Sequence, residues 1–279
     1  MTPPPTSAES PPRRDGILSV IRQKAIETYY LVDDFLPRRP NRQAWLRLVR
    51  LPNLLTVPGD ILAGFLLAPT VRPAVWSQLL LAVPASLLLY AAGLILNDLF
   101  DYAEDLRDRP ARPLPANQIS REAAAAVALV LLWIAAFLAA FFDALPVALP
   151  MILCIILYDL GLKRLPVIGP LLMGACRAGN VLLGTAAATG GLFLVPGAWG
   201  GALAVGTYVA CITHLARTET QPDTAYPPSL IGRLLRLLIP LQALLCVLAI
   251  HRFPANLLGL VLLPILKLHR RLAAGFPPS

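Results

Sequence analysis

The sequence predicts an all-α, polytopic membrane protein, a helical bundle of about eight spans. Three observations support this prediction. The chain is 57% hydrophobic and 14% charged, whereas soluble domains carry about 25% charged residues. Its apolar residues fall in blocks of nearly the length that crosses a bilayer. Its basic residues lie between alternate blocks, which is the pattern that orients membrane helices.

Residues 1–44 differ in composition from the rest of the chain. Residues 1–15 are rich in Pro and Ser, which predicts a disordered tail. Residues 17–36 show helical apolar spacing with charges between. This spacing suits an amphipathic helix in the membrane interface, and it equally suits a soluble helix packed on its own protein. Residues 45–279 are the predicted transmembrane domain.

Eight apolar blocks follow. A span needs about 20 apolar residues, or as few as about 17, so several blocks are at or below the lower limit. The last block is interrupted by Pro264 and is the weakest. We predict about eight spans, between roughly seven and nine. The blocks cover residues 52–70, 77–97, 122–142, 144–159, 167–194, 196–213, 230–250 and 254–268.

The distribution of basic residues predicts the orientation. If the N-terminus is cytoplasmic, 21 of the 24 Lys and Arg residues lie in the cytoplasmic segments, and the exceptions are Arg72, Arg177 and Arg252. This asymmetry predicts cytoplasmic N- and C-termini and an even number of spans in the cell membrane. The net charge of +8 is accounted for by loops that face anionic lipid, so we expect no nucleic-acid partner.

The second block ends in a run of carboxylates. Asp98, Asp101 and Asp105 are spaced i, i+3, i+7 and would share one helical face, with Asn97 beside it. Three like charges repel, and ionised groups are costly at the end of an apolar helix, so a cation should offset them. Oxygen ligands with room for water and phosphate suit Mg²⁺. The plainer alternative is a solvated helix end that stops the span.

An Arg-Pro turn follows the carboxylates. It reads Arg109-Pro-Ala-Arg112-Pro-Leu-Pro, and its prolines prevent helix formation. Arg109 and Arg112 can reach back toward anionic groups, and arginine forks match phosphate oxygens. A metal-binding face beside an arginine turn at the membrane surface suggests a diphosphate on an apolar tail.

At this point a resemblance enters. The stretch NDLFDYAEDLRDRPARPLPANQIS resembles the first aspartate-rich motif of the UbiA prenyltransferase superfamily, N-D-x-x-D-x-x-x-D followed by an Arg-Pro turn. The resemblance extends upstream to LRLVRLPNLLTVPGDILAGFLLA and downstream to YDLGLKRLPVIGPLLMGACRAGNVLLG, about residues 45–215 in all. Within the superfamily, the context of Asp60 and the Cys-Arg-x-x-Asn segment are most similar to the UbiA-like EboC branch.

The resemblance implies a UbiA-like helical fold around a central cavity open toward the cytoplasmic side. It implies a prenyl diphosphate donor, Mg²⁺ and an aromatic or other small acceptor. Donor-binding roles carry over to Arg50, Asn53, Tyr158 and Lys163. The Mg²⁺–diphosphate roles carry over to Asn97, Asp98, Asp101 and Asp105.

The chain departs from the family pattern in three ways: Asn117 replaces the usual Gly after the Arg-Pro turn, eight spans are found where the family usually has nine, and one acidic motif is missing. Family enzymes carry a second Asp-x-x-x-Asp motif after the sixth span. Here Cys211–Glu219 reads CITHLARTE, and Glu219 and Asp223 are the only nearby acids. His214 in this stretch is a further candidate for a metal ligand or base, although a lone histidine at a span end is more often neither. With this motif missing, fewer metal ions are expected.

A second polar group lies in the fifth block. Arg177 and Asn180 lie one turn apart, with Gly184 on the same face. An arginine inside a span costs at least about 3 kcal/mol without a partner. Either this stripe lines the cavity and binds substrate, or Arg177 pairs with Asp60 to hold two helices together, and the two interpretations are compatible. We expect Arg177 to replace part of the missing second metal site.

Two functions remain open. The first is a membrane-embedded, Mg²⁺-dependent prenyltransferase, in which Lys163, Arg112 and Arg177 help to stabilise the departing diphosphate. The second is a non-catalytic UbiA-like protein that binds or transports a prenylated or aromatic metabolite.

Overall fold

The computed structural model describes four stretches of the chain: residues 41–69, 73–191, 194–218 and 229–275. Contacts divide the chain into Met1–Pro40 and Asn41–Ser279. The predicted disordered tail and the predicted helix over residues 17–36 lie outside the described residues.

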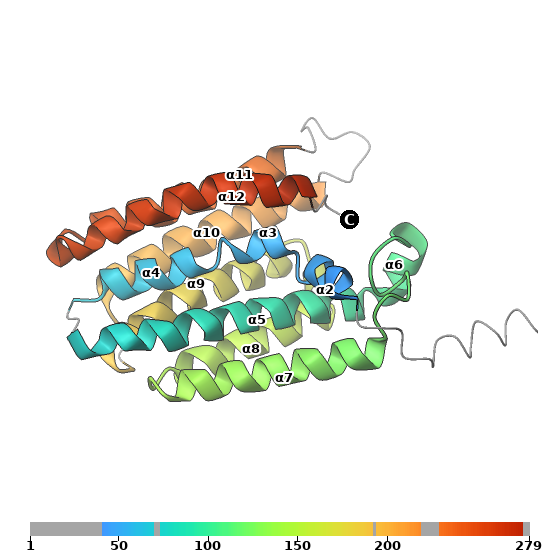
Figure 1. Ribbon diagram of the computed structural model, residues 1–279, viewed down its shortest axis with the longest axis horizontal. Coiled ribbons are helices and arrows are strands. Elements are labelled where there is room, and N and C mark those ends of the chain that lie inside the picture. The colour runs from blue at the N-terminus through green and yellow to red at the C-terminus, as the bar shows by residue number, and fades with distance from the viewer. Residues whose placement is uncertain (1–40, 70–72, 192–193, 219–228, 276–279) are drawn as a thin grey trace, which may run out of the picture. The chain divides into compact units, whose positions relative to one another are not determined.

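The predicted all-α class is confirmed, because the described residues form helices and turns and no strand (Figure 1). Short 3₁₀ segments join some of the helices, and the one that matters for the site is η2 (Leu162–Arg164). The α-helices are α2 (Arg42–Leu48), α3 (Leu51–Leu54), α4 (Pro58–Leu67), α5 (Leu79–Phe100), α6 (Tyr102–Asp108), α7 (Arg121–Ala140), α8 (Leu145–Asp159), α9 (Ile168–Thr189), α10 (Pro196–Thr218), α11 (Ser229–Leu248) and α12 (Leu262–Gly275).

Five of the predicted blocks become helices that are long and apolar enough to cross a membrane, and two more become shorter apolar helices. The last block differs from the prediction. It forms a 3₁₀ segment, Ala255–Val261, and then α12, which carries Lys267, Arg270 and Arg271. The count of eight spans therefore stays a prediction. The five long helices are Trp76–Phe100, Arg121–Ala140, Ile168–Thr189, Pro196–Arg217 and Leu230–Leu248; the shorter ones are Leu51–Leu67 and Leu145–Asp159.

The first apolar block is broken in its middle. The hydroxyl of Thr56 donates to the carbonyl of Asn53 at 2.8 Å, and α4 begins two residues later at Pro58. Proline suits a first helical position because it has no N–H to donate. The break leaves the carbonyl of Thr56 without a helical partner, and buried side chains from α9 and α11 donate to it.

Helix α9 lies at the centre of the bundle and packs against α4 and α10. Glycines make this close approach possible. A Cβ on Gly64 would lie 1.8 Å from the carbonyl oxygen of Val181, and one on Gly174 would lie 2.5 Å from that of Gly206. Small residues at such positions let helix backbones approach closely in lipid, and Gly174 has this role between α9 and α10.

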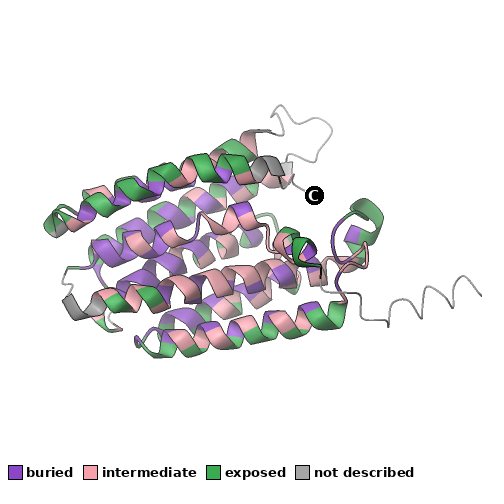
Figure 2. Cartoon of the chain, viewed as in Figure 1, coloured by how far each residue is buried: buried purple, intermediate pink, exposed green. Residues whose placement is uncertain are grey.

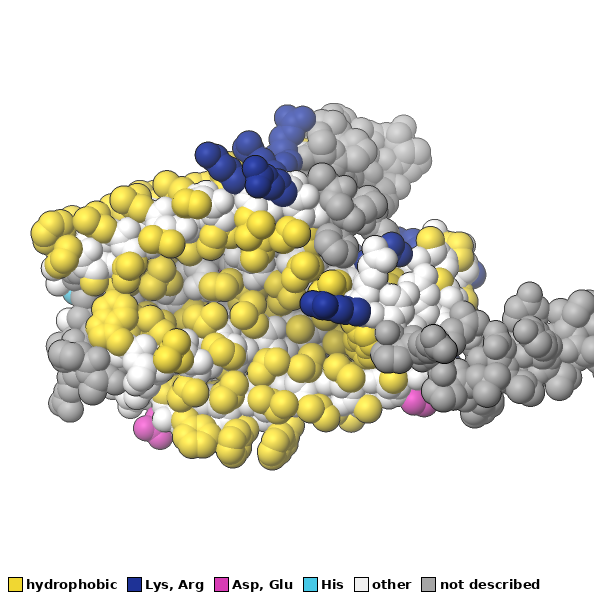
Figure 3. Space-filling model, in the orientation of Figure 1, with side chains coloured by type: hydrophobic (Ala, Val, Ile, Leu, Met, Phe, Trp, Pro, Cys, Tyr) yellow, Lys and Arg dark blue, Asp and Glu magenta, His cyan; other side chains and the backbone are white. Residues whose placement is uncertain are grey.

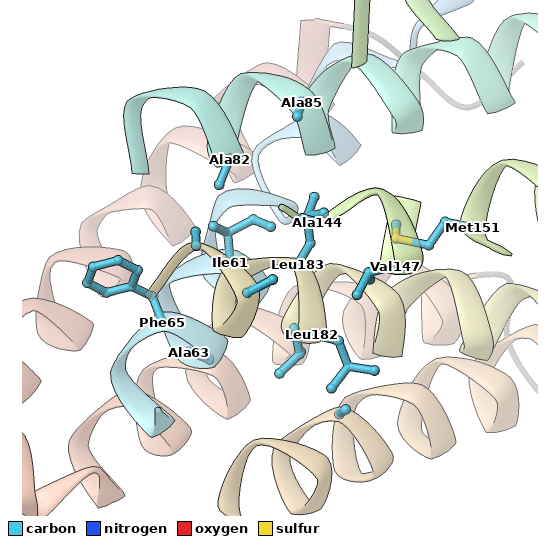
Figure 4. Close-up of a cluster of buried hydrophobic side chains, with 14 of the residues drawn as sticks. Ile61, Ala63, Phe65, Ala82, Ala85, Ala144, Val147, Met151, Leu182 and Leu183 are labelled. Carbon is cyan, nitrogen blue, oxygen red and sulfur yellow. The ribbon is translucent and has the colours of Figure 1, made fainter. Parts of the chain in front are cut away.

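The core lies between these helices, and large apolar side chains also cover the outside. Ile61, Phe65 and Leu183 are fully buried (Figure 4). On the outer face of α7, Trp133 is 67% exposed and stacks on Phe137 with ring centroids 5.5 Å apart. Figures 2 and 3 show exposed positions along this helix and a broad hydrophobic face. So large an apolar surface is unfavourable in water, and lipid is its natural solvent.

The basic segments gather at one end of the bundle. Helices α5, α8 and α10 end there, and α7, α9 and α11 begin there, as the ion pair of Lys163 with Asp101 and the bond from the Tyr208 hydroxyl to the carbonyl of Leu234 show. The clustering agrees with the alternation of basic loops in the sequence, and it places the carboxylates of α5 on the basic end.

Candidate functional site

The carboxylate run spans a break between two helices. Helix α5 ends at Phe100, Asp101 caps it with non-helical backbone, and α6 starts at Tyr102. A continuous helix would place Asp98, Asp101 and Asp105 on one face. Asp98 and Asp105, on either side of the break, both contact Arg112, whereas Asp101 contacts Lys163. Convergence of all three carboxylates on one metal ion stays a prediction.

Two of the carboxylates share one arginine. Arg112 Nη1 lies 2.6 Å from Asp105 Oδ2 and 3.4 Å from Asp98 Oδ1, and all three side chains are nearly fully buried. Arg50 Nη2 adds a second contact to Asp98 at 3.0 Å, and Arg109 lies 3.6 Å from Asp105. The Arg-Pro turn reaches back to the carboxylates, as predicted. Its Arg112 contacts protein carboxylates and so connects α5, α6 and the turn.

The third carboxylate faces a different partner. Lys163 Nζ, on η2, lies 2.7 Å from Asp101 Oδ1 and 3.6 Å from Asp159. The Asn97 amide donates to Asp101 Oδ2 at 3.2 Å and accepts from Lys163 at 3.2 Å. The Lys163 ammonium also lies 5.9 Å from the ring centre of Tyr158. Asn97, Asp101, Tyr158 and Lys163 therefore form one connected polar cluster.

These residues fit a magnesium ion only together with a substrate. The described residues contain no group of three His, Cys, Asp or Glu side chains placed to hold a metal. Mg²⁺ in substrate sites is commonly held by one or two carboxylates, with waters and phosphate oxygens as the other ligands. Asn97 and Asp101 meet this requirement, since both line an open cavity. Asp98 and Asp105 are outside its lining.

The place of the missing second acidic motif has another use. The Arg217 guanidinium, near the end of α10, donates to the carbonyls of Lys163, Arg164 and Leu165. A ring nitrogen of His214 lies 3.3 Å from the carbonyl of Pro166. A basic clamp on the turn that carries Lys163 therefore stands where family enzymes carry carboxylates.

Two cavities adjoin at this end of the bundle. A polar vestibule of about 570 Å³ is lined by Asp101, Lys163, Arg217 and other polar side chains. A largely apolar chamber of about 140 Å³ lies between α5, α8 and α9. Asn97 and Tyr158 line both cavities, so the two meet at these residues.

A buried polar network lies along the chamber. Arg177 and Asn180 line it, and Arg177 Nε lies 3.0 Å from Asp60 Oδ2. The sequence offered a cavity wall or a structural pair with Asp60, and the structure contains both. Because Asp60 balances its charge, Arg177 has little positive charge to offer in place of a metal ion.

Sequence reasoning missed three members of this network. Gln242 on α11 donates from Nε2 to Asp60 Oδ1 and to the carbonyl of Thr56, both at 2.6 Å. The hydroxyl of Ser86 on α5 donates to Asn180 Oδ1 at 2.6 Å, and Tyr90 lines the chamber. A lone glutamine inside an apolar block was a usable signal for Gln242.

Asn53, predicted to bind the donor, lies in α3 and lines neither cavity.

Fold and site together define a class of protein. It is a polytopic helical membrane protein with a charged vestibule above an apolar chamber, which suits a ligand with an anionic head and an apolar tail. A model of the UbiA prenyltransferase family matches residues 60–272. The chain belongs to that family.

Solved structures show the same fold. A structure concerning digeranylgeranylglyceryl phosphate synthase in membranes has a TM-score of 0.52 at 18% identity, and covers 83% of this chain and 94% of that one. A UbiA homolog from Archaeoglobus fulgidus bound to DMAPP and Mg²⁺ has a TM-score of 0.52 at 16% identity, with 84% and 90% covered. At such identities the likeness concerns the fold alone.

Curated relatives match over shorter stretches. The digeranylgeranylglyceryl phosphate synthase of Methanoculleus marisnigri is 35% identical over 143 residues, 50% of either chain. The protoheme IX farnesyltransferase of Salinispora tropica is 36% identical over 159 residues, 55% of this chain and 47% of that protein. The chain thus spans about half the length of the curated relatives it matches. These matches do not show the EboC-like branch.

Proposed function

We propose that this chain is a membrane-embedded prenyltransferase, which transfers an isoprenyl group from a prenyl diphosphate to an aromatic or other small acceptor with the help of Mg²⁺. The observation that carries the proposal is the junction of the vestibule and the chamber at Asn97 and Tyr158. A diphosphate in the vestibule and a prenyl tail in the chamber satisfy both surfaces at once. Membership of the UbiA prenyltransferase family and a relative named as a farnesyltransferase support the same reaction class.

The vestibule residues have distinct roles in this proposal. Lys163 and Arg164 face the diphosphate, and Arg217 holds the turn that carries them. Asn97 and Asp101 hold Mg²⁺, which supplies positive charge to the diphosphate. Asp98 and Asp105 keep Arg112 in place and so support the end of α5.

The reaction then needs little covalent chemistry from the protein. The C–O bond of the donor breaks, and its electron pair leaves with the diphosphate, which Lys163 stabilises. The nucleophilic atom of the acceptor supplies the electron pair of the new bond and afterwards loses a proton. The apolar chamber walls, among them Leu89, Ile155 and Met173, exclude water from the allylic cation.

The reaction is tested with purified full-length protein, Mg²⁺ and a panel of prenyl diphosphates. We expect Mg²⁺-dependent release of diphosphate, and in Lys163→Met a rate lower by roughly 100-fold, because one charged group aimed at a leaving group is commonly worth about that much. Lys267→Met on the exposed face of α12 is the matched control and should keep its rate. Tight binding of every donor without turnover would instead support a non-catalytic protein that binds or transports a prenylated or aromatic metabolite. The missing second acidic motif is the observation that motivates this alternative.

We also propose that the vestibule opens to the cytoplasm and that both termini are cytoplasmic. The support is the gathering of basic segments at the vestibule end. A reporter fused after Ser279 should be active only in its cytoplasmic form. Activity confined to the opposite side would exclude this orientation.

Within the family, we retain the EboC-like branch as a proposal that rests on the context of Asp60 and on the Cys-Arg-x-x-Asn segment.

A further inference from the structure

Two nitrogens of Arg177, Nε and Nη1, have no hydrogen-bond partner among the described residues, although Nε lies 3.0 Å from Asp60 Oδ2. The side chain of Arg177 is 4% exposed. Nη2 donates to the carbonyl of Thr56 at 2.8 Å, and Nε faces Asp60. Nη1 is buried and has no hydrogen-bond partner among the described residues. Leaving a buried charged donor without a partner is costly, so a group absent from the protein chain itself is expected there.

The surroundings hold the guanidinium in place. Asp60 is fully buried, and Gln242 donates to both Asp60 and the carbonyl of Thr56. The centre of the guanidinium lies 5.9 Å from the ring centre of Tyr90, within the range of a cation–π contact. Arg177 thus contacts α4, α5 and the break before α4, and its Nη1 has few alternative orientations.

The charge of the chamber determines the kind of group that fits. A further anion beside Arg177 would also face the Asp60 carboxylate, whereas an uncharged oxygen would accept a charge-assisted hydrogen bond without adding charge. The other charged side chains that line the chamber also lie near opposite charges, although Lys163 is shared between Asp159 and Asp101. The ion pairs are Arg177–Asp60 at 3.0 Å, Arg50–Asp98 at 3.0 Å and Asp159–Lys163 at 3.6 Å.

The site is separate from the diphosphate position. Tyr90, beside Arg177, and Asn97, at the vestibule, both lie on α5. Seven residues of α-helix separate them along the axis by about 10 Å. A diphosphate in contact with Asn97 and Lys163 therefore lies about two helical turns from Tyr90, the residue of α5 that Arg177 faces.

We propose that Arg177 Nη1, next to Asn180, binds an uncharged oxygen of the acceptor, a carbonyl or hydroxyl on an apolar or aromatic ring, inside the chamber. This assignment rests on the proposed function, since it gives the prenyl acceptor its place beside the tail of the donor. It also names a class of acceptor: neutral, apolar and oxygen-bearing, not a phosphate or a carboxylate.

Three matched ligands test the assignment: naphthalene, 1-naphthol and 1-naphthoate. Their binding to full-length protein in lipid nanodiscs is measured by calorimetry, without donor. Wild-type protein should bind naphthol roughly 10-fold more tightly than naphthalene, the gain of one hydrogen bond to a charged group, and naphthoate no more tightly than naphthalene. The double variant Asp60→Asn/Arg177→Met removes both charges together and should lose the preference for naphthol. Arg236→Met, an arginine on α11 outside the chamber lining, is the matched control and should keep it.

Each other outcome overturns the proposal. Equal binding of naphthol and naphthalene by wild type means that a buried water satisfies Nη1. Tighter binding of naphthoate means an anion site. If the double variant still prefers naphthol, the naphthol oxygen binds elsewhere. If the double variant does not fold, the comparison is repeated with Arg177→Lys, which keeps the positive charge and loses the forked guanidinium. Binding of geranyl diphosphate is measured separately. If wild-type protein does not bind geranyl diphosphate, the prenyltransferase proposal is refuted, and the naphthol comparison can still be interpreted.

Discussion

Replacing Asp101 with alanine is expected to abolish Mg²⁺-dependent binding of a prenyl diphosphate. Asp101 is the carboxylate of the original run that lines the vestibule, and it lies 2.7 Å from Lys163. Even groups that only support metal ligands are worth about 10- to 100-fold in affinity. We therefore expect affinity for geranyl diphosphate with Mg²⁺ to fall by more than roughly 100-fold, while binding without Mg²⁺ changes far less.

Calorimetric titration with and without Mg²⁺ measures this difference directly, and it needs no turnover. Asp108→Ala, an exposed acid on the same helix pair, is the matched control and should bind as wild type does. If Asp101→Ala retains the full Mg²⁺ effect, the metal site at this end of α5 is wrong, whatever the rate of the enzyme.

The second large effect is on stability and concerns Arg112. Its guanidinium is the buried partner of both Asp98 and Asp105. Removing one member of a buried ion pair leaves an uncompensated charge and commonly costs about 3–5 kcal/mol. Arg112→Met should therefore lower the free energy of unfolding by about that amount. Thermal unfolding in detergent, followed by helical circular dichroism, measures the loss.

Two comparisons show whether the loss comes from the pair. Arg109 also contacts Asp105, but its side chain is 47% exposed and the distance is 3.6 Å. Exposed pairs are worth up to about 1 kcal/mol, so Arg109→Met should unfold almost as wild type does. Adding Asp98→Asn and Asp105→Asn to Arg112→Met removes the uncompensated charges and should restore much of the stability. Equal losses for Arg109→Met and Arg112→Met would refute the role assigned to Arg112.

Much of this architecture was readable from the chain. Composition and block length predict a helical membrane bundle, and the run from Asn97 to Asp105 marks the polar end of α5. The pairing of Arg177 with Asp60 was also foreseeable, because an arginine inside a span needs a partner and Asp60 is the acid within the first block.

The rest depends on tertiary contacts that spacing does not contain. Periodicity does not show that Asp98 and Asp105 pair with Arg112 while Asp101 pairs with Lys163. The hydrogen bond from Arg217 to the carbonyl of Lys163 joins residues 54 positions apart in the sequence, and no local pattern predicts it. The burial of Asp98 and Asp105 and their contacts with Arg112 also depend on tertiary structure that the spacing does not contain.

The shared wall at Asn97 and Tyr158 has an evolutionary consequence. Among the described cavity linings, the vestibule and the chamber share only side chains of α5 and α8. Substitutions on α10 therefore change the surface that faces the head group of the donor. Substitutions on α9 change the surface that faces the acceptor beside the prenyl tail. Selection can act on these two surfaces one at a time. A lineage built on this plan can acquire a new acceptor and still draw on the same pool of donors.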